Sequence, residues 1–298
     1  MIHCLGEALV DLICERPVRS LAEADAFAPH FGGALANVAV AAARAGAQAG
    51  LAGAAGDDAW GRWVRERLEA EGVDLTFFDL APGARTPVAF ATVDPSGEPS
   101  FEIYGEAIAD ALNLLGPRVS ELAAASEALV FGSTTLAEEG EREVTDRARA
   151  AAFEHGVRVC FDPNIRPNRW HGGIARAHQA SRERVSRSFL VRTNRDEAVA
   201  ITGTDDPRQA AGELAAMGAE LAVVTLGAEG AVMRGACEAE ALAPEVELVS
   251  SIGAGDAFMG TLVAELARRK WRSEDAGEAL VPALAAAARA CTHWSAVA

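Results

Sequence analysis

The sequence has 298 residues, half of them hydrophobic, and a formal net charge of −16 at pH 7. A chain of this length and apolar content can bury the core of one large domain. Its negative charge repels phosphate backbones and so argues against a nucleic-acid-binding protein. A local group of main-chain N–H donors can still hold a nucleotide.

The five cysteines are widely spaced and form no Cys-x-x-Cys pair. This pattern predicts neither a disulfide framework nor a zinc site. The first residues lack the basic and apolar segments of a secretion signal, and no apolar stretch is long enough to span a membrane. We therefore expect a cytoplasmic protein without a membrane segment.

Short β-type runs alternate with helix-type runs along most of the chain. The expected strands are Ile2–Leu5, Ala128–Phe131, Val157–Phe161, Phe189–Val191 and Leu221–Thr225. The expected helices are Leu35–Ala45, Glu139–Phe153, Ile174–Ser186, Asp196–Thr202 and Pro207–Met217, with a further helix that Asp57 or Asp58 caps and Gly72 ends. This alternation predicts a parallel sheet covered by helices on both faces.

One stretch departs from this alternation. Thr86–Val93 and Phe101–Tyr104 are strand-like, and a turn of Asp, Pro, Ser and Gly separates them. This pattern predicts a β-hairpin, which could join residues 13–31 in a small sheet that covers a ligand site. An edge hairpin of the main sheet fits the same pattern.

The segment from residue 246 to 259 predicts a strand, a turn of small residues and a helix. Val246–Val249 is the expected strand, and the helix is expected to begin near Ala257. A helix start directs free N–H groups and a positive partial charge at one point, and glycine lets an anion come close to the backbone. The turn therefore predicts a phosphate-binding loop, although it has neither the P-loop lysine nor the GxGxxG pattern.

Asp256, the last residue of this turn, has two interpretations. An aspartate at a helix start commonly caps the helix. It can also act as the general base that takes a proton from a hydroxyl beside a γ-phosphate. The local pattern alone favours the cap.

The turn Gly253-Ala254-Gly255-Asp256 resembles the C-terminal signature of the ribokinase-like (PfkB-type) carbohydrate kinases. Further matches follow the order of that family: Gly6-Glu7 with Asp11, Gly32-Gly33-Ala34-Leu35-Ala36-Asn37, Gly56-Asp57-Asp58 with Gly61, Asp162-Pro163-Asn164 with Arg166, Asn194 with Glu197, and Thr225-Leu226-Gly227. Chance would have to supply both the residues and their order. The segment from Asp162 to Trp170 is most similar to fructokinases.

The resemblance implies an α/β fold with three α/β/α layers, a mostly parallel central sheet and a small β lid. Residues 1–298 would form one kinase domain, with lid segments at about 13–31 and 86–105. The implied activity is transfer of the γ-phosphoryl group of ATP to a small sugar, with a fructose-like ketose favoured. Ribose, 2-keto-3-deoxygluconate or a nucleoside are alternative acceptors, and a non-catalytic sugar or nucleotide sensor is the alternative of another class.

The resemblance also implies roles for individual residues. Asp256 would be the base, and the N–H groups of Gly253, Ala254 and Gly255 would hold the developing charge. The implied sugar-binding residues are Asp11, Gly32, Gly33, Asn37, Tyr104 and Arg166. The implied nucleotide-binding residues are Asn194, Glu197, Thr225, Gly227 and Gly255, with Glu197 supporting Mg²⁺ indirectly.

Each role has a structural alternative. Asp11 could be a solvated turn residue, and Gly32 and Gly33 could form an ordinary turn before a helix. Asn194 and Glu197 could simply begin a helix, because Asn is a common cap and acidic residues favour the first turn. Tyr104 could anchor the lid sheet instead of touching substrate.

Two features concern ions and partners. Ser250-Ser251 stand where relatives usually have Asp-Thr, an aspartate that in several relatives helps bind a monovalent cation. Because serine lacks that charge, the resemblance does not imply potassium activation here. We expect a small-molecule sugar as the partner, with no nucleic acid and no membrane, and a homodimer that pairs through the lid.

Overall fold

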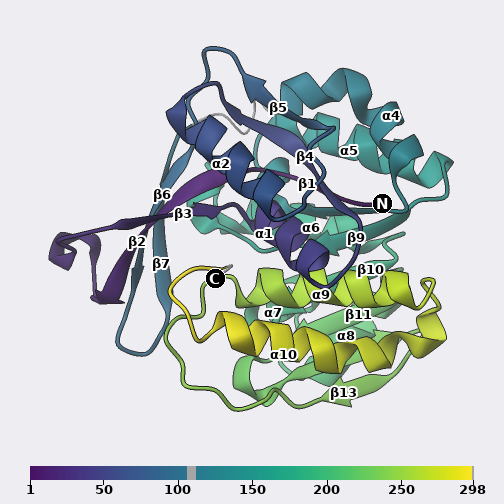
Figure 1. Cartoon of the computed structure of the whole chain (residues 1–298). Coiled ribbons are helices and arrows are strands. Elements are labelled where there is room, and N and C mark those ends of the chain that lie inside the picture. Colours follow the sequence, from purple (N-terminus) through teal and green to yellow (C-terminus); the bar gives the residue numbers. More distant parts are fainter. Residues whose placement is uncertain (106–111, 297–298) are drawn as a thin grey trace.

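The structure, a computed structural model, describes residues 1–105 and 112–296. Its larger sheet has nine strands in the order β13-β12-β11-β10-β9-β8-β1-β4-β5 (Figure 1). The strands are β1 Ile2–Leu5, β4 Ala49–Gly56, β5 Phe78–Ala81, β8 Ala128–Gly132, β9 Arg158–Asp162, β10 Leu190–Asn194, β11 Leu221–Thr225, β12 Ala231–Gly235 and β13 Ala239–Ala241. Neighbours from β11 to β5 run parallel, whereas β12 and β13 are antiparallel.

Helices cover both faces of this sheet. One face packs against α1 Ala34–Arg44, α2 Ala59–Ala70, α9 Ala254–Arg268 and α10 Leu280–Ala290. The other packs against α4 Val119–Ala125, α5 Glu139–Glu154, α6 Ile174–Val185, α7 Arg195–Thr202 and α8 Pro207–Ala216. Shorter 3₁₀ turns lie at Leu21–Glu23, Gly116–Arg118, Ser133–Leu136, Pro167–Arg169, Gly227–Glu229 and Ser273–Ala279.

The sheet separates two apolar cores because successive side chains of a strand point to opposite faces. In β10, Leu190 packs in the core beside α1, α9 and α10, and Val191 packs in the core beside α5 to α8. Strands buried on both faces explain the nearly continuous apolar runs of the sequence. The expected three-layer fold is confirmed.

A second, four-stranded sheet projects from this body (Figure 1). It comprises β2 Leu9–Pro17, β3 Ala28–Gly32, β6 Val88–Val93 and β7 Pro99–Tyr104, in the order β3-β2-β6-β7. The predicted hairpin of β6 and β7 is confirmed, and it belongs to this small sheet, not to an edge of the large one. The sheet begins at Leu9, a few residues before the predicted lid boundary.

The predicted strand Val246–Val249 is wrong. The segment is extended but pairs with no strand among the described residues, and Val246 and Leu248 are exposed. Two hydrogen bonds hold its end instead, from Val249 N–H to the Cys291 carbonyl and from Ser251 N–H to the Gly97 carbonyl. The residues of this segment favour a β-strand, but they have no neighbouring strand among the described residues to pair with.

The remaining predicted elements are present, with ends that differ by at most three residues. Asp58 caps α2, since its carboxylate accepts from Gly61 N–H at 2.8 Å. Helix α9 begins at Ala254, earlier than predicted, because Gly253 takes the left-handed conformation at φ 72° and turns the chain into the helix.

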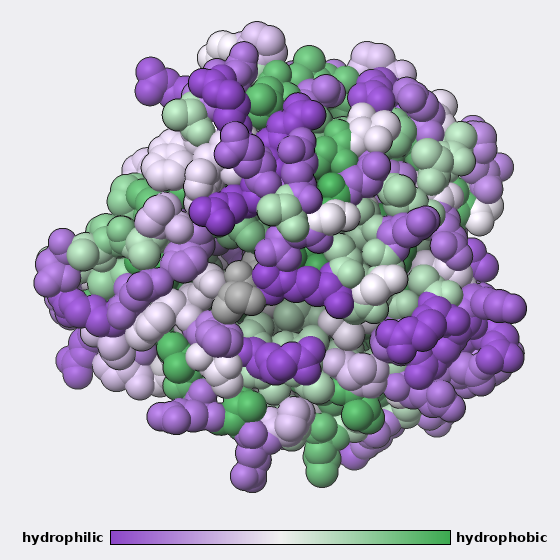
Figure 2. Space-filling view, viewed as in Figure 1, coloured by the Kyte–Doolittle hydropathy of each residue, from purple (hydrophilic) through white to green (hydrophobic). Residues whose placement is uncertain are grey.

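The surface of the molecule is mixed in character. Figure 2 shows hydrophilic side chains gathered where α9 ends and at the tip of the projecting small sheet, with apolar side chains between them. In the described part of the chain, no helix is long and apolar enough to cross a membrane.

Candidate active site

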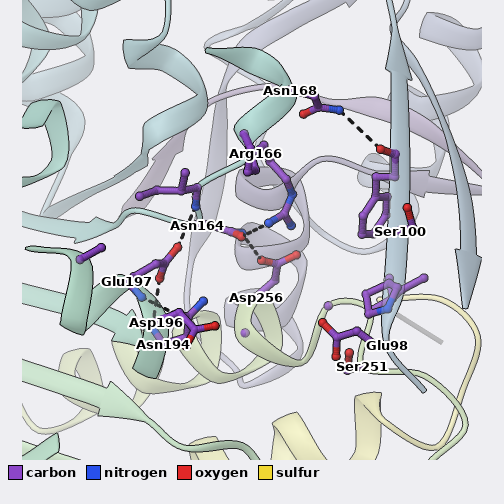
Figure 3. A pocket seen from close by; sticks show the side chains of 18 of the residues that line it. Glu98, Ser100, Asn164, Arg166, Asn168, Asn194, Asp196, Glu197, Ser251 and Asp256 are labelled. Carbon is purple, nitrogen blue, oxygen red and sulfur yellow. Dashed lines mark hydrogen bonds between the residues drawn. The ribbon is translucent and has the colours of Figure 1, made fainter. Parts of the chain in front are cut away.

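Asp256 lies in the first turn of α9, at the ends of the parallel strands. Its side chain is only 6 % exposed, and both carboxylate oxygens accept hydrogen bonds. Asn37 donates to one oxygen at 2.9 Å and Asn164 to the other at 3.1 Å, as Figure 3 shows for Asn164. Gly253 is the N-cap residue of α9, and the Asp256 carboxylate accepts only from Asn37 and Asn164 among the described residues, so Asp256 does not cap this helix.

Two cavities meet at this carboxylate. The small cavity, of about 50 Å³, lies under the small sheet, and the large cavity, of about 840 Å³, opens beside α7 and α9. The residues that line both are Phe101, Arg166, Ile252, Gly253 and Asp256. A group in either cavity can therefore reach the same carboxylate.

Asp11 and Asn37 provide polar groups in the small cavity. Asp11 lies in β2 of the small sheet, not in a turn after the first strand, and it is buried. Burial, reinforced by the charge of Asp256, raises the pKa of Asp11 to about 7, although Arg166 opposes the shift. The amide oxygen of Asn37 is buried without a hydrogen-bond partner among the described residues. Both groups can therefore accept hydrogen bonds from a ligand.

Gly32 and Gly33 lie where no side chain fits. A Cβ at Gly32 would come within 2.1 Å of Asp11 Oδ2, and one at Gly33 would come within 2.4 Å of the Glu7 carbonyl. Gly33 also has φ 103°, which disfavours other residues, and it precedes α1. Gly33 lines the small cavity, whereas Gly32 acts behind it by leaving room for the Asp11 carboxylate.

Arg166 lies between the two cavities. Its guanidinium donates to Asn164 Oδ1 at 2.6 Å and lies over the Phe101 ring. Asn164 in turn donates to Asp256, so the arginine is linked to the carboxylate through one amide (Figure 3). Burial raises the pKa of Asp256, while the hydrogen bond from Asn37 and the charge of Arg166 oppose the shift.

Asn194 and Glu197 begin α7 at the edge of the large cavity. The Asn194 side chain accepts from Glu197 N–H at 2.8 Å, and Glu197 accepts from Asn194 N–H at 3.0 Å. The other oxygen of Glu197 accepts from Ile165 N–H at 2.7 Å. The capping hydrogen bonds are thus present, and both side chains also line the large cavity.

The start of α9 offers N–H donors to the same cavity. The Ala254 N–H donates to the Ser251 carbonyl at 3.3 Å, so it is not one of the free donors. The N–H groups of Gly255 and Asp256 have no acceptor within the described residues, as expected for the first turn of a helix. The helix start can hold an anion there.

This geometry can hold a hydroxyl-bearing molecule on one side of a buried carboxylate and an anion on the other. A model of the pfkB family of carbohydrate kinases matches residues 1–298. The chain belongs to this family. It is therefore a sugar kinase, a phosphotransferase, and the resemblance drawn from its motifs is confirmed.

Named relatives support the same assignment. The chain is 33% identical over 273 residues to fructokinase-1 of Oryza sativa subsp. japonica, covering 88% of this chain and 82% of the relative. It is 30% identical to aminoimidazole riboside kinase of Salmonella typhimurium, covering 98% and 89%. A double-mutant fructokinase of Vibrio cholerae O395, solved with fructose, ADP and a potassium ion, superposes with a TM-score of 0.86 at 29% identity, covering 99% and 93%.

Besides Gly32 and Ala254, three predicted residues of this PfkB kinase lie outside both cavities. Tyr104 is 59 % exposed and packs edge-on against Phe90, on the opposite face of β7 from Phe101 and Ile103, which line the small cavity. This position fits the alternative role of a lid anchor. Thr225 ends β11 and Gly227 follows it, and neither residue lines the large cavity.

Sequence reasoning gave no role to Glu7, although it belongs to a matched motif, and it missed Arg192. Glu7 anchors the start of α1 by accepting from Ala34 N–H, and it also accepts from the Thr134 hydroxyl. Arg192 lines the large cavity from β10, where it hydrogen-bonds to Asp162. A charged residue inside an otherwise apolar strand was the available signal, because such residues are rarely buried without a partner.

Proposed function

We propose that this PfkB kinase transfers the γ-phosphoryl group of ATP to a hydroxyl of a neutral sugar, with a fructose-like ketose favoured. The observation that supports this most is that Asp256 lines both cavities. In the reaction, the acceptor oxygen bonds to the γ-phosphorus and the bond from that phosphorus to ADP breaks. The hydroxyl proton passes to Asp256.

The small cavity is proposed as the acceptor site. The Asp11 carboxylate and the Asn37 amide oxygen would accept hydroxyl hydrogen bonds, and Gly33 would allow the sugar to approach the backbone. The volume of about 50 Å³ is smaller than a sugar, so the small sheet must move outward to admit one. Closure of that sheet would then exclude water from the reacting groups.

Charge argues for a neutral acceptor. Glu7, Asp11 and Asp256 face the small cavity, and Arg166, whose charge opposes the raised pKa of Asp256, also lines it. Arg169 also lines it but already pairs with Glu141 at 2.7 Å. A carboxylate on the acceptor would meet an excess of negative charge. A ketose therefore fits better than the sugar acid 2-keto-3-deoxygluconate.

The large cavity is proposed as the ATP site. The free N–H groups of Gly255 and Asp256 would hold phosphate oxygens, and Asn194 and Glu197 would face the metal-bound end of the nucleotide. Among the described residues, no group of three or more acidic, His or Cys side chains could hold a metal ion. Few protein ligands are enough for Mg²⁺, because this ion keeps several of its waters. ATP would carry the ion, which would neutralise phosphate charge.

The alternatives are separated by an ADP-release assay with ATP, Mg²⁺ and a panel of ketoses, aldoses, sugar acids and nucleosides. We expect the highest kcat/KM with a fructose-like ketose and at least about tenfold lower values with sugar acids. A preference for ribose or a riboside would replace the ketose, in line with the aminoimidazole riboside kinase relative. Measurable sugar binding without ADP release from any acceptor would favour the sensor.

We also propose that a second copy of the chain covers the exposed side of the small sheet. Phe27, Phe90 and Tyr104 form a row of edge-to-face aromatic rings on that side. Light scattering should give a dimer for the native chain and a monomer for Tyr104→Glu. A native monomer at micromolar concentration would contradict this assembly.

For the compartment, we propose the cytoplasm. All five cysteines are unpaired, and Cys4, Cys14 and Cys160 are buried as small core residues. Unpaired thiols are typical of a reducing compartment. Fractionation of the host cell would test the location, and recovery in an oxidising compartment would contradict it.

A further inference from the structure

Arg192 is a buried cation that the motif analysis does not assign to any role. It is the third residue of β10 and only 8 % exposed. Its two neighbouring strands supply its partners: NH1 donates to the Asp162 carboxylate at 3.3 and 3.4 Å, and NH2 donates to Thr225 Oγ1 at 2.7 Å. A charge at this depth needs such partners to remain ionised.

The guanidinium points at the start of α9. Arg192 follows the same face of β10 as Leu190, which packs in the core beside α9. A Cβ built on Gly255 would lie 2.8 Å from NH1, 3.0 Å from NH2 and 3.2 Å from Cζ of Arg192. The guanidinium therefore fills the space that any other residue at position 255 would need.

This placement brings together two sources of positive charge. The start of α9 carries a positive partial charge, and the guanidinium lies directly against it. Although burial opposes its charge, the carboxylates of Asp162 and Glu197 raise the pKa of Arg192 and keep it a cation. Two like charges side by side are unfavourable unless anions lie near them, and the carboxylates of Asp162, Glu197 and Asp256 are the anions near Arg192 in the protein itself.

The bonds to Asp162 do not satisfy this cation. Charge-assisted N–H···O bonds are usually near 2.7–2.9 Å, whereas both distances from NH1 to Asp162 exceed 3.2 Å. Arg192 Nε has no partner among the described residues. The side chain lines the large cavity together with Asn194, Gly253 and Gly255. Donor capacity therefore remains for a ligand in that cavity.

We propose that Arg192 binds the phosphate groups of the nucleotide in the large cavity, together with the free N–H groups of α9. This inference rests on the proposed function, because it assumes that the large cavity is the ATP site. Asp162 and Thr225 are positioning residues that hold the guanidinium from the two neighbouring strands. Gly255 lacks a side chain so that the guanidinium can lie beside the helix start.

Isothermal titration calorimetry with ADP and with adenosine tests this proposal. In Arg192→Gln, we expect ADP to bind about 10- to 100-fold more weakly, since a charged hydrogen bond to phosphate is lost. Adenosine, which has no phosphate, should bind as in the native chain. Arg192→Lys should recover part of the ADP affinity, because it restores the charge but not the planar pair of donors.

A matched control is the buried Arg184, which pairs with Asp146 at 2.6 Å and lines neither cavity. Arg184→Gln should lower the melting temperature without changing ADP affinity. If Arg192→Gln folds and binds ADP within threefold of the native chain, Arg192 is a structural residue only and the proposal is wrong.

Removing one partner of a buried ion pair can also prevent folding. The double variant Asp162→Asn with Arg192→Gln removes both charges and leaves no unpaired buried ion. We expect the same loss of ADP affinity in it, and unchanged affinity would equally overturn the proposal. If the native chain itself binds no ADP and releases none from ATP, the proposed function fails instead.

Discussion

The two cavities on either side of Asp256 offer different groups to a ligand. Glu7, Asp11 and Asp256 face the small cavity with their carboxylates. Arg192, the Asn194 side chain and the free N–H groups of α9 face the large one, where Asp196 and Glu197 also lie. In the proposed function, carboxylate acceptors therefore bind a hydroxyl-bearing molecule on one side, and N–H donors bind a polyanion on the other.

The two sides also come from different parts of the chain. Asp11 of β2 and Asn37 of α1 line only the small cavity, whereas Arg192 of β10 and Glu197 of α7 line only the large one. Strand β7 and the start of α9 contribute to both. Variants on one side should therefore change the handling of one substrate. A variant of the shared carboxylate should instead change the chemical step.

Asp256→Asn should have the largest effect. The amide keeps the shape of the side chain but cannot take the hydroxyl proton, so we expect kcat to fall about 10²- to 10⁴-fold. ADP affinity should stay within a few-fold of the native value, as measured by calorimetry. Near-normal turnover in a folded variant would remove Asp256 as the base.

Asp206 is the control for that variant, because it is a true helix cap whose carboxylate accepts from Gln209 N–H at 2.8 Å. Asp206→Ala should lower the free energy of unfolding by about 1 kcal/mol and leave kcat unchanged. If Asp256→Asn, like Asp206→Ala, lowered only the free energy of unfolding and left kcat unchanged, Asp256 would not be the base.

The same carboxylate predicts an acidic limb in the pH profile. Burial raises the pKa of Asp256 and raises that of Asp11 to about 7. Because Asp256 must be ionised to act as the base and Asp11 must be ionised to bind as a carboxylate, kcat/KM for the acceptor should fall as the pH falls. The part of this fall that Asp11 causes should lie near pH 7. The two groups interact, so the midpoint belongs to the pair. A profile flat from pH 8 to about pH 5 would contradict the raised pKa values.

His3 gives a comparison with a buried group far from both cavities. It donates from Nδ1 to Ser126 Oγ, which itself donates to the Leu122 carbonyl, and its Nε2 is buried without a partner. Burial lowers the pKa of His3 from 6.5 to about 4. The unfolded chain therefore takes up the proton first as the pH falls, and stability is lost between these two values.

Relative to His3→Gln, the native chain should lose about 3 kcal/mol of unfolding free energy between pH 7 and pH 4. Urea unfolding at several pH values measures this difference. Equal pH dependence of native and His3→Gln chains would show that His3 titrates normally.

Asp11→Asn should act on the acceptor side alone. We expect KM for the sugar to rise about 10- to 100-fold, because a charged hydrogen-bond acceptor is replaced by a neutral amide. KM for ATP should stay within twofold. Glu15→Gln, an exposed change on the same strand that affects only the contact with His30, should alter neither KM. Equal rises for both substrates in Asp11→Asn would break the proposed separation.

Leu248→Ala should give the smallest effect and act on both sides. Leu248 packs on Gly97 at the tip of the β6–β7 hairpin, and the neighbouring Ser251 N–H bonds to the Gly97 carbonyl at 3.0 Å. Loosening this contact should shift the wall that the two cavities share. KM for the sugar and KM for ATP should each rise about threefold, which corresponds to a loss of less than about 1 kcal/mol of binding free energy. A change confined to one substrate would show that the tip serves one cavity only.

Much of the site could be predicted from the sequence because its residues form local motifs. The capping box of Asn194 and Glu197 and the small-residue turn before α9 follow from spacing alone. Asp256 could be placed at a helix start, but its contacts to Asn37 and Asn164 come from distant segments. Only the tertiary structure therefore excludes a cap.

The errors have physical causes. The side of β7 on which Tyr104 lies depends on pairing register, since a shift of one residue moves every side chain to the other face. Val246–Val249 has strand residues but no neighbour to pair with. Arg192 was missed because its two partners come from β9 and β11, which lie next to β10 only in the folded sheet.

The most direct test is a crystal structure of the kinase with a non-hydrolysable ATP analogue and its preferred sugar. We predict the sugar in the small cavity and the γ-phosphate in the large one. One sugar hydroxyl should lie about 2.6–3.2 Å from an Asp256 oxygen and point at the γ-phosphorus. A sugar bound elsewhere, or Asp256 held by Asn37 and Asn164 with no ligand hydroxyl in reach, would contradict the account.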